Sequence, residues 1–242
     1  MSKAVSPDQV NESILRRRWR KFKTLKRGYY SLVILSCLYG ISFFLPFLIN
    51  NRALVVKYHG EYYFPVLSGY TPGKQFGQDV PGDTRYRKLK VQFKEQNEED
   101  SWVWMPPYPY SPYEDITFEG NKPYEPPSRT HWLGTDNTGR DVFARLCYAF
   151  NISISFALLL TIINYIIGVL IGGTMGYYGG KFDLFFQRLI EIWSSLPMLF
   201  VIIILSSILK PSFLLLISIY TLVNWISMTY LMRAEFYREK AK

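Results

Sequence analysis

The sequence predicts an all-α integral membrane protein with four transmembrane helices and one long loop outside the membrane. The chain of 242 residues is 49% hydrophobic and 17% aromatic, yet its mean hydropathy is +0.01. Such a balance indicates that very apolar segments alternate with polar ones. The apolar stretches have the length of membrane spans, and positive charge is concentrated at one end of the chain.

The N-terminal segment, residues 1–28, is a basic tail with nine Lys or Arg residues against two acids. Residues 50–150 hold 12 basic and 13 acidic residues. Since Lys and Arg beside a span favour the cytoplasmic side, we expect the tail in the cytoplasm and the loop outside. The basic run 16–27 also suggests nucleic acid, but a basic segment just before a span is more typical of an orientation signal that contacts anionic lipid. We therefore expect membrane lipid, and no nucleic acid, as a partner.

Four spans follow from the uncharged stretches. Residues 29–49 and 152–177 contain no charge, and each is long enough for the roughly 20 residues that cross a bilayer. A third helix is expected over 185–209, where an amphipathic run leads into an apolar stretch. A fourth is expected over 213–232, after a tight turn at Lys210, Pro211 and Ser212. An even number of spans returns the basic C-terminal segment to the cytoplasm.

The outer loop, residues 50–130, is rich in Tyr, Trp and Pro. Proline excludes regular helix from stretches such as 105–110, and residues 58–66 and 86–93 are interpreted as short strands. The loop is then either a small ordered cap or an extended segment over the helices. It serves either as a spacer or, as its aromatic side chains favour, as a surface for a soluble partner or substrate.

The segment 131–150 ends in a helix signal. Thr138 and Asp141 have the spacing of a capping box, and apolar residues follow at helical spacing. We expect this helix on the outer membrane surface. Its polar residues Arg140, Asp141 and Arg145 either face solvent or pair with neighbouring loops.

One face of the second span carries Gly168, Gly172 and Gly176, spaced four residues apart. Such a face lets another backbone approach closely, and the partner is a helix of this chain or of a second subunit. Asn164 and Asn224 are expected to form hydrogen bonds between helices.

Several function classes are disfavoured. No Asp, Glu, Lys, Arg or His lies in the middle of a span, which disfavours a proton-driven transporter and an intramembrane enzyme. His131 and Asp136 lack a third candidate ligand nearby, so no metal site is expected. The phosphate-binding pattern GxxxxGK[ST] does not occur, so we expect no ATP hydrolysis by this chain.

Residues 131–146, HWLGTDNTGRDVFARL, resemble the HxLGTDxxGRDVxSRL signature of the C-type subunit in dipeptide and oligopeptide ABC importer permeases. The matching positions that the resemblance assigns to a periplasmic interface are His131, Leu133, Gly134, Thr135, Asp136, Gly139, Arg140 and Asp141. Residues 176–183 are similar to the GYxGGxxD turn of this family. The long outer loop and residues 232–236 most resemble its Yej-type branch, and the resemblance runs from the first span to the last residue.

The resemblance implies a peptide permease of type I importer topology in the bacterial inner membrane. It also implies a second permease subunit, two ATP-binding subunits that hold ATP and Mg, a periplasmic peptide-binding protein and a peptide substrate. No cofactor is expected in this chain itself. In the family, a cytoplasmic coupling loop with a pattern like RExxEYVxAARALG docks on the ATPase.

In this sequence Arg233, Glu235, Arg238 and Glu239 stand at the entrance of that coupling loop, and the chain ends at Lys242. The coupling helix and about two later spans of the family pattern are then missing, so we expect a truncated chain. A smaller departure lies at 149–151, where the family commonly has a Gly and a basic residue.

The alternative is a noncatalytic membrane receptor or scaffold that binds a partner through the outer loop without transport. Co-purification with ATPase subunits distinguishes the two hypotheses. A membrane-bound hydrolase is disfavoured because the sequence offers no nucleophile and base at suitable spacing.

Overall fold

The computed structural model describes residues 13–79, 82–96, 100–116, 124–210 and 212–242. The first twelve residues of the basic tail and Pro211 of the predicted turn lie outside the described residues. The chain divides into two compact units, residues 1–151 and residues 152–242.

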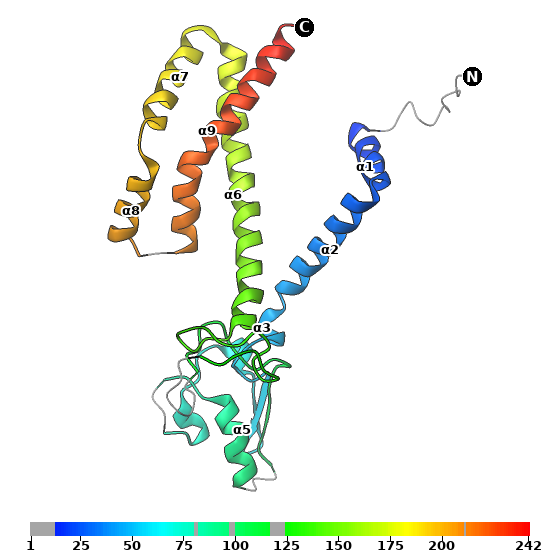
Figure 1. Cartoon of the computed structure of the whole chain (residues 1–242), viewed down its shortest axis with the longest axis vertical. Coiled ribbons are helices and arrows are strands. Elements are labelled where there is room, and N and C mark those ends of the chain that lie inside the picture. The colour runs from blue at the N-terminus through cyan, green and yellow to red at the C-terminus, as the bar shows by residue number, and fades with distance from the viewer. Residues whose placement is uncertain (1–12, 80–81, 97–99, 117–123, 211) are drawn as a thin grey trace, which may run out of the picture. The chain divides into compact units, whose positions relative to one another are not determined.

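Two helices open the first unit (Figure 1). Helix α1, Ile14–Thr24, and helix α2, Lys26–Ser42, are separated only by Leu25. After α2 the chain turns at Phe43 and Phe44 and forms one further helical turn, α3, Leu45–Leu48. The predicted span 29–49 is therefore interrupted near its end, and its continuous helix α2 has 17 residues.

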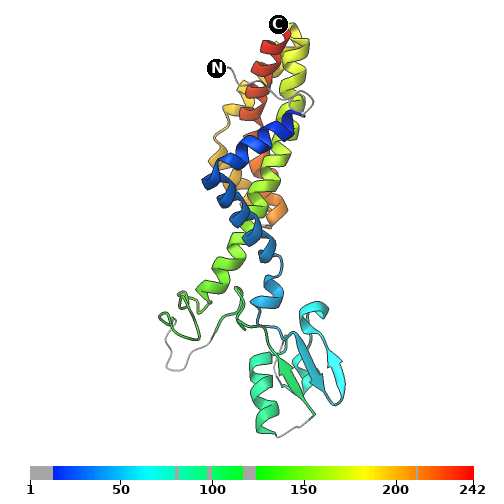
Figure 2. The same ribbon diagram turned by 90° about the vertical axis from the view of Figure 1, so that its right-hand side faces the viewer.

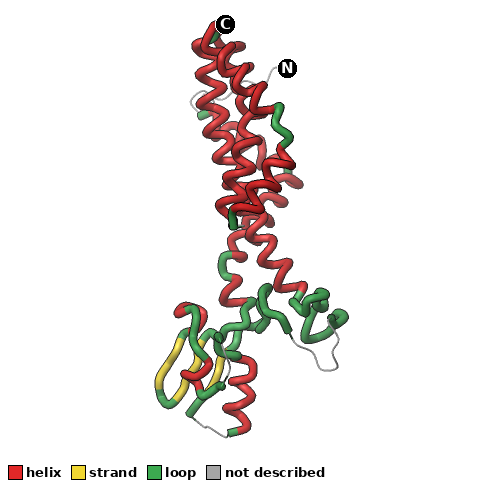
Figure 3. Tube along the Cα trace, turned by 90° about the vertical axis from the view of Figure 1, so that its left-hand side faces the viewer, coloured by secondary structure: helices red, strands yellow, loops and turns green. Residues whose placement is uncertain are grey.

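The described residues of the loop 50–130 form a folded cap built on a three-stranded antiparallel sheet in the order β2-β1-β3, shown in yellow in Figure 3. The strands are β1, Val55–Tyr58, β2, Glu61–Tyr63, and β3, Trp102–Trp104. His59 and Gly60 both have positive φ and form the two-residue turn between β1 and β2. The short helices α4, Pro65–Ser68, and η2, Gly73–Phe76, precede the longer helix α5, Tyr86–Glu95. Of the two arrangements expected for the loop, the structure has the ordered one.

Helix α5 lies beside the sheet, as Figure 2 shows, and closes the core of the cap. The interpretation of residues 86–93 as a strand is therefore wrong. Tyr86, Leu89 and Phe93 are buried at the i, i+3, i+7 spacing of one helical face, whereas a strand would bury alternate residues. The interpretation of 58–66 as one strand holds only for β2, because a turn precedes it and α4 follows it. The buried core consists of Ala53, Val56, Phe76, Tyr86, Leu89, Phe93 and Val103.

A second buried cluster joins α3 to the start of helix α6, which runs from Val142 to Tyr178. Leu45, Ile49, Tyr108 and Ala144 form its centre. Across this contact the Tyr148 hydroxyl donates to the Ile49 carbonyl at 2.9 Å. Helix α3 and Ile49, which follow α2, are therefore attached to the first turns of α6.

The second unit contains the rest of α6 with α7, Gly180–Ser194, α8, Met198–Ile208, and α9, Phe213–Lys240. In Figure 1, α9 runs beside this part of α6, and α7 and α8 run in the opposite direction. The separate surface helix expected before residue 151 does not exist, because α6 is one continuous helix of 37 residues. At about 1.5 Å per residue it is ~55 Å long, which exceeds the ~30 Å of a bilayer core.

Among the described residues, α6 and α9 are each long and apolar enough to cross a membrane, and α7 with α8 counts as a third span if the pair acts as one. The predicted continuous helix 185–209 is wrong, because α7 and α8 meet at a 69° bend. Pro197 stands at this break, where it lacks the backbone N–H that a continuous helix needs. Helix α9 continues past the predicted end at residue 232 to Lys240.

Candidate functional site

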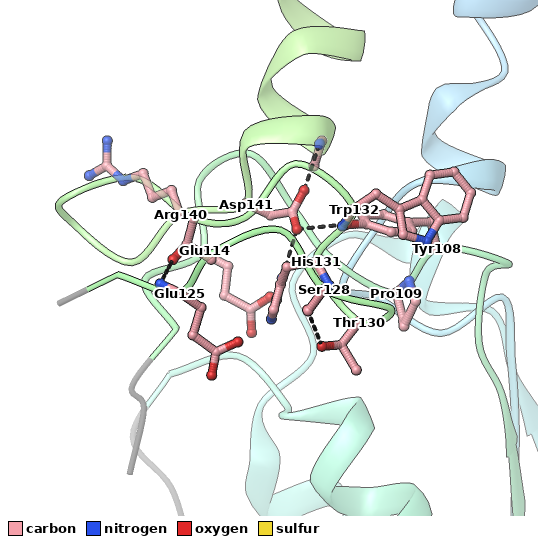
Figure 4. A network of polar contacts seen from close by, with 12 residues as sticks. Tyr108, Pro109, Glu114, Glu125, Ser128, Thr130, His131, Trp132, Arg140 and Asp141 are labelled. Atoms are coloured by element: carbon pink, nitrogen blue, oxygen red, sulfur yellow. Dashed lines mark hydrogen bonds and ion pairs between the residues drawn. The ribbon is translucent and has the colours of Figure 1, made fainter. Parts of the chain in front are cut away.

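The signature segment is organised around the buried carboxylate of Asp141, drawn in Figure 4. Its Oδ1 accepts a hydrogen bond from the Ala144 backbone N–H at 2.7 Å, and Asp141 is thereby the N-cap of α6. Its Oδ2 accepts from the Tyr108 hydroxyl at 2.7 Å and lies 2.7 Å from Nδ1 of His131. Because an ionised carboxylate only accepts hydrogen bonds, this Nδ1 carries the proton.

The capping-box prediction placed the cap at Thr138 and is wrong. The Thr138 hydroxyl and backbone N–H instead donate to Oδ1 of Asp136, at 2.7 and 2.9 Å. The acid at the fourth position of the pattern is itself the cap, and the helix begins at Val142.

His131 and Tyr108 hold this cap from the loop side. His131 is 4% exposed, its backbone N–H donates to the Ser128 hydroxyl at 3.0 Å, and its ring lies 4.3 Å from that of Tyr110. Burial, together with the hydrogen bond to Asp141, raises the pKa of Tyr108 above its ordinary value. Tyr108 therefore stays a hydrogen-bond donor at neutral pH.

Two glycines of the signature are required by the backbone. Gly134 has φ +72° and Gly139 has φ +78°, a region that L side chains rarely adopt. A Cβ atom at Gly134 would lie 2.6 Å from the Glu125 carbonyl oxygen, and one at Gly139 would lie 2.6 Å from that of Ile116. These two positions therefore let the signature pack against the preceding loop.

Thr135 and Asp136 complete the turn. The Thr135 hydroxyl accepts from the Glu125 backbone N–H at 2.7 Å, and Oδ1 of Asp136 also accepts from the Arg140 N–H at 2.9 Å. Partial burial raises the pKa of Asp136, but the hydrogen bonds from Arg140 and Thr138 and the charge of Arg145 outweigh it and lower the pKa to about 2. The Asp136 side chain is therefore ionised throughout the physiological range.

The arginines of the signature pair with neighbours. Arg140 Nε lies 2.9 Å from the Asp115 carboxylate, and Arg145 forms an ion pair with Asp136. The sequence left open whether Arg140, Asp141 and Arg145 face solvent or pair with neighbouring loops. Both arginines pair with loop residues, and Asp141 is fully buried. Leu133 is 45% exposed and is the one predicted signature position with a large apolar side chain directed to solvent.

The glycine face of α6 meets α9, a helix of this chain. A Cβ atom would lie 2.5 Å from Met228 Cβ at Gly168, 2.3 Å from the Thr229 carbonyl oxygen at Gly172, and 2.6 Å from Phe236 Cβ at Gly176. Of the two partners left open by the sequence, the structure has the internal helix.

The two asparagines of these helices form no hydrogen bond between helices in the described residues. The Asn224 side chain donates to the Tyr220 carbonyl within its own helix at 2.9 Å, so its prediction is wrong. Asn164 is buried, and its Oδ1 has no hydrogen-bond partner among the described residues.

An ion pair that the sequence did not predict lies where α7 begins. The carboxylate of Asp183 accepts two hydrogen bonds from Arg233, at 2.5 and 2.6 Å, and a third from the Tyr237 hydroxyl at 2.9 Å. The Asp183 side chain is 9% exposed. These contacts attach the turn between α6 and α7 to the last part of α9. The sequence signal for this ion pair was one acid, Asp183, and one base, Arg233, each beside a long apolar stretch.

The residues assigned to a coupling-loop entrance lie on α9, not in a loop. Arg233 forms its ion pair with Asp183, whereas Glu235, Arg238 and Glu239 lie on the exposed side of α9. Arg238 pairs with Glu235 at 2.5 Å, and Glu239 pairs with Lys242 at 2.7 Å.

Among the described residues, no three metal-ligating side chains gather in one place. His131 and Asp136 serve different contacts, with Asp141 and with the Thr138 turn. The contacts of Asp141 and Asp183 hold helix ends in position.

Comparison with known proteins identifies relatives. Residues 168–242 match the family of binding-protein-dependent transport system inner membrane components. The chain is 42% identical over 224 residues to the inner membrane ABC transporter permease protein YejE of Escherichia coli, covering 92% of this chain and 64% of that protein. It is 35% identical over 252 residues to the peptidoglycan transport system permease protein YejE of Agrobacterium fabrum, covering 93% of this chain and 64% of that protein.

A more distant relative is the dipeptide transport system permease protein DppC of Bacillus subtilis, 39% identical over 110 residues that cover 46% of this chain and 34% of that protein. The chain spans 64% of the length of the two YejE proteins it matches. The chain is therefore a multi-pass membrane protein that is similar to the permeases named YejE, and its residues 168–242 match the family of binding-protein-dependent transport system inner membrane components.

Proposed function

We propose that this chain is the transmembrane permease subunit of an ATP-binding-cassette importer that moves peptides or peptide-like compounds across the bacterial inner membrane. The observation that carries the proposal is the 42% identity to the Escherichia coli permease over 92% of this chain. Other similar permeases are named for dipeptides, oligopeptides and peptidoglycan, which all contain peptide chains. A peptide component is therefore the shared feature of the substrate class.

The proposed topology has four spans. The first is α2 continued through residues 43–48, the second is the apolar part of α6, the third is the bent pair α7 and α8, and the fourth is residues 213–232 of α9. The basic tail lies in the cytoplasm and the cap in the periplasm, which the charge difference between residues 1–28 and 50–150 supports. In a variant carrying Cys37→Ser and Cys147→Ser, a cysteine at Lys88 should react with an impermeant thiol reagent outside intact cells, and a cysteine at Lys23 should not. The reverse pattern would invert the topology.

The proposed partners are a second permease subunit, two ATP-binding subunits that hold ATP and Mg, and a periplasmic peptide-binding protein. No residue of α8 is buried by the described parts of this chain, which leaves α8 available to lipid or to the second permease. The cap offers the binding protein an aromatic surface on the outer side of its sheet. There Tyr62, Trp102 and Trp104 are 58%, 42% and 61% exposed and alternate with the buried Val56 and Val103.

On the cytoplasmic side we propose that Glu235, Arg238 and Glu239 contact an ATP-binding subunit. They lie on a helix, and a helix can transmit force that a frayed segment cannot. ATP hydrolysis itself belongs to the partner subunits.

The test is peptide-stimulated ATP hydrolysis by the chain reconstituted with its proposed partners in liposomes. Stimulation that requires this chain supports the permease. The chain alone should neither hydrolyse ATP nor move peptide. If the chain binds the peptide-binding protein but retains no ATPase subunit on purification, it is a receptor or scaffold instead.

A further inference from the structure

Helix α1 is amphipathic, with large apolar side chains on one side and four of its six basic side chains on the other. At about 100° per residue, Leu15, Trp19 and Phe22 fall on one side of the helix. The opposite side is formed by Arg16, Arg17, Arg20 and Lys21. No residue of α1 is buried by the described parts of the chain, and Leu15 and Trp19 are 79% and 48% exposed. A helix with this pattern fits a surface that accepts apolar side chains and also carries negative charge for the basic ones.

The charge of this region is of one sign. From Ser13 to Gly60 the sequence contains no Asp or Glu, while α1 alone carries six Lys or Arg residues. The segment therefore lacks acidic side chains of its own along its length. A negatively charged surface complements it.

The junction with α2 places α1 directly beside the proposed first span. The Leu25 N–H donates to the Phe22 carbonyl at 2.9 Å, and the Tyr29 N–H donates to the Leu25 carbonyl at 3.0 Å. The Phe22 ring lies against Gly28, where a Cβ atom would be 3.5 Å from it, and it stacks with Trp19 at 5.6 Å. With one residue between the two helices, α1 cannot move far from the end of α2.

We propose that α1 lies in the plane of the cytoplasmic leaflet and binds anionic phospholipid. Leu15, Trp19 and Phe22 enter the boundary between headgroups and acyl chains, and the basic side contacts lipid phosphates. Nucleic acid would satisfy the basic side but leave Leu15 and Trp19 in water. The choice of leaflet rests on the topology proposed above, whereas binding in the membrane plane does not.

The test uses the full chain with Cys37→Ser and Cys147→Ser and a spin label on a cysteine at Leu15 or at Arg17. In nanodiscs of phosphatidylcholine mixed with phosphatidylglycerol, the label at position 15 should collide with oxygen and be protected from a water-soluble nickel chelate. The label at position 17 should show the reverse. In discs of phosphatidylcholine alone, protection at position 15 should fall.

Charge variants complete the design. Arg16→Gln, Arg20→Gln and Lys21→Gln together should lose the protection at position 15, with a change of roughly fivefold in the bound-to-free ratio per residue. Arg16→Lys with Arg20→Lys should keep it. Equal nickel access at both positions in the anionic discs overturns the proposal. Protection that is the same in both lipids and unchanged by the Gln variant overturns the role of anionic headgroups. If added RNA protects position 17 and leaves position 15 open to the nickel chelate, the basic side binds nucleic acid and the proposal is overturned.

Both faces of a nanodisc are open to solvent, so this measurement does not depend on the orientation of the chain. Failure of the topology appears in thiol labelling of intact cells, and failure of the α1 proposal appears in the nanodiscs. The two outcomes are therefore separable.

Discussion

The carboxylate of Asp141 is the residue on which the signature segment depends. It receives one hydrogen bond from the first turn of α6, one from the Tyr108 loop and one from His131. These groups are far apart in sequence or belong to different elements, so one side chain fixes where the helix begins and how two loops meet it. Because Asp141 is fully buried, water cannot replace a lost partner.

Asp141→Asn should lower the stability of the chain by about 1 to 3 kcal/mol. Asn remains a good N-cap, but its amide group can satisfy only part of a site that contains three donors. The measurement is the thermal midpoint in detergent, with Asp115→Asn as the control. The Asp115 side chain is 67% exposed and, among the described residues, pairs with Arg140, so its variant should change little. Equal effects of the two variants would show that the buried network is not special.

The ionisation of Asp136 should make stability depend on acid pH. Its pKa is lowered from 3.8 to about 2 in the folded chain, so ionised Asp136 stabilises the folded state above its unfolded pKa. This contribution is lost as pH falls from about 4 through about 2. The difference in thermal midpoint between the parent chain and Asp136→Asn should be constant from pH 7 to pH 5 and shrink below pH 4. A difference that grows with acidification would contradict the assignment.

The sequence predicted which signature residues matter but not how they act. A short motif contains its own local contacts, such as the bonds from Thr138 to Asp136. It does not contain Tyr108, which lies in a proline-rich stretch of another loop. The spacing of Thr138 and Asp141 fitted a cap at Thr138, whereas the positive φ of Gly139 and the bond from the Ala144 N–H to Asp141 show that the helix starts later.

At the scale of elements, α6 and α9 are joined along a face that the glycine spacing predicted. The spacing identifies a place where backbones approach closely, but it does not name the partner, since the matching surface of α9 has no small-residue repeat. The contacting groups there are Met228, the Thr229 carbonyl and Phe236. The apolar stretch also predicted α7 and α8 as one helix. Hydrophobicity alone gives no information about a bend, such as the one at Pro197.

Gly172→Ala should destabilise this contact. The added Cβ atom would lie 2.3 Å from the Thr229 carbonyl oxygen, which is backbone and cannot move alone. We expect a loss of about 1 to 3 kcal/mol from overpacking, seen as a lower thermal midpoint. Gly40→Ala is the matched control, because Gly40 lies inside α2 with nothing within 4 Å of the added atom. That variant should be neutral or stabilising by up to about 1 kcal/mol.

Removing one partner of the Asp183–Arg233 pair should cost more than removing both. Asp183→Asn leaves the guanidinium without its two strong acceptors, at a cost on the order of 3 kcal/mol. Tyr237→Phe removes one hydrogen bond and should cost about 1 kcal/mol. Thermal midpoints of Asp183→Asn, Arg233→Gln and the double variant test this. Additive losses would mean that the pair is not coupled.

At the scale of the whole molecule, two parts of the chain offer surfaces to the proposed partners. The cap has its own buried core and an aromatic outer surface, and α9 extends as a helix beyond its apolar part. The composition predicted the membrane class, because apolar length and charge asymmetry are properties of single segments. It could not predict α5, because basic residues stand between Tyr86, Leu89 and Phe93 and make the helical spacing of these apolar residues hard to recognise in the sequence.

The proposed contact with the ATP-binding subunit can be separated from stability by exchanging charges within α9. Glu235→Lys with Arg238→Glu keeps an i, i+3 pair of opposite charges but reverses its direction, so the exposed helix should lose less than about 0.5 kcal/mol. If these side chains meet the ATPase, the reversed pattern places like charges against each other, and association should weaken and stimulated hydrolysis fall. The control is Arg188→Glu with Glu191→Arg, which reverses an exposed pair of the same spacing on α7.

The measurement is peptide-stimulated ATP hydrolysis in the reconstituted complex, together with the amount of ATPase subunit retained on purification. The contact is assigned to α9 if the α9 exchange lowers both stimulated hydrolysis and ATPase retention while the thermal midpoint stays the same. The α7 exchange should lower neither. Full stimulation with the α9 exchange would place the contact elsewhere, because a charge pattern that faces a partner cannot be inverted without effect.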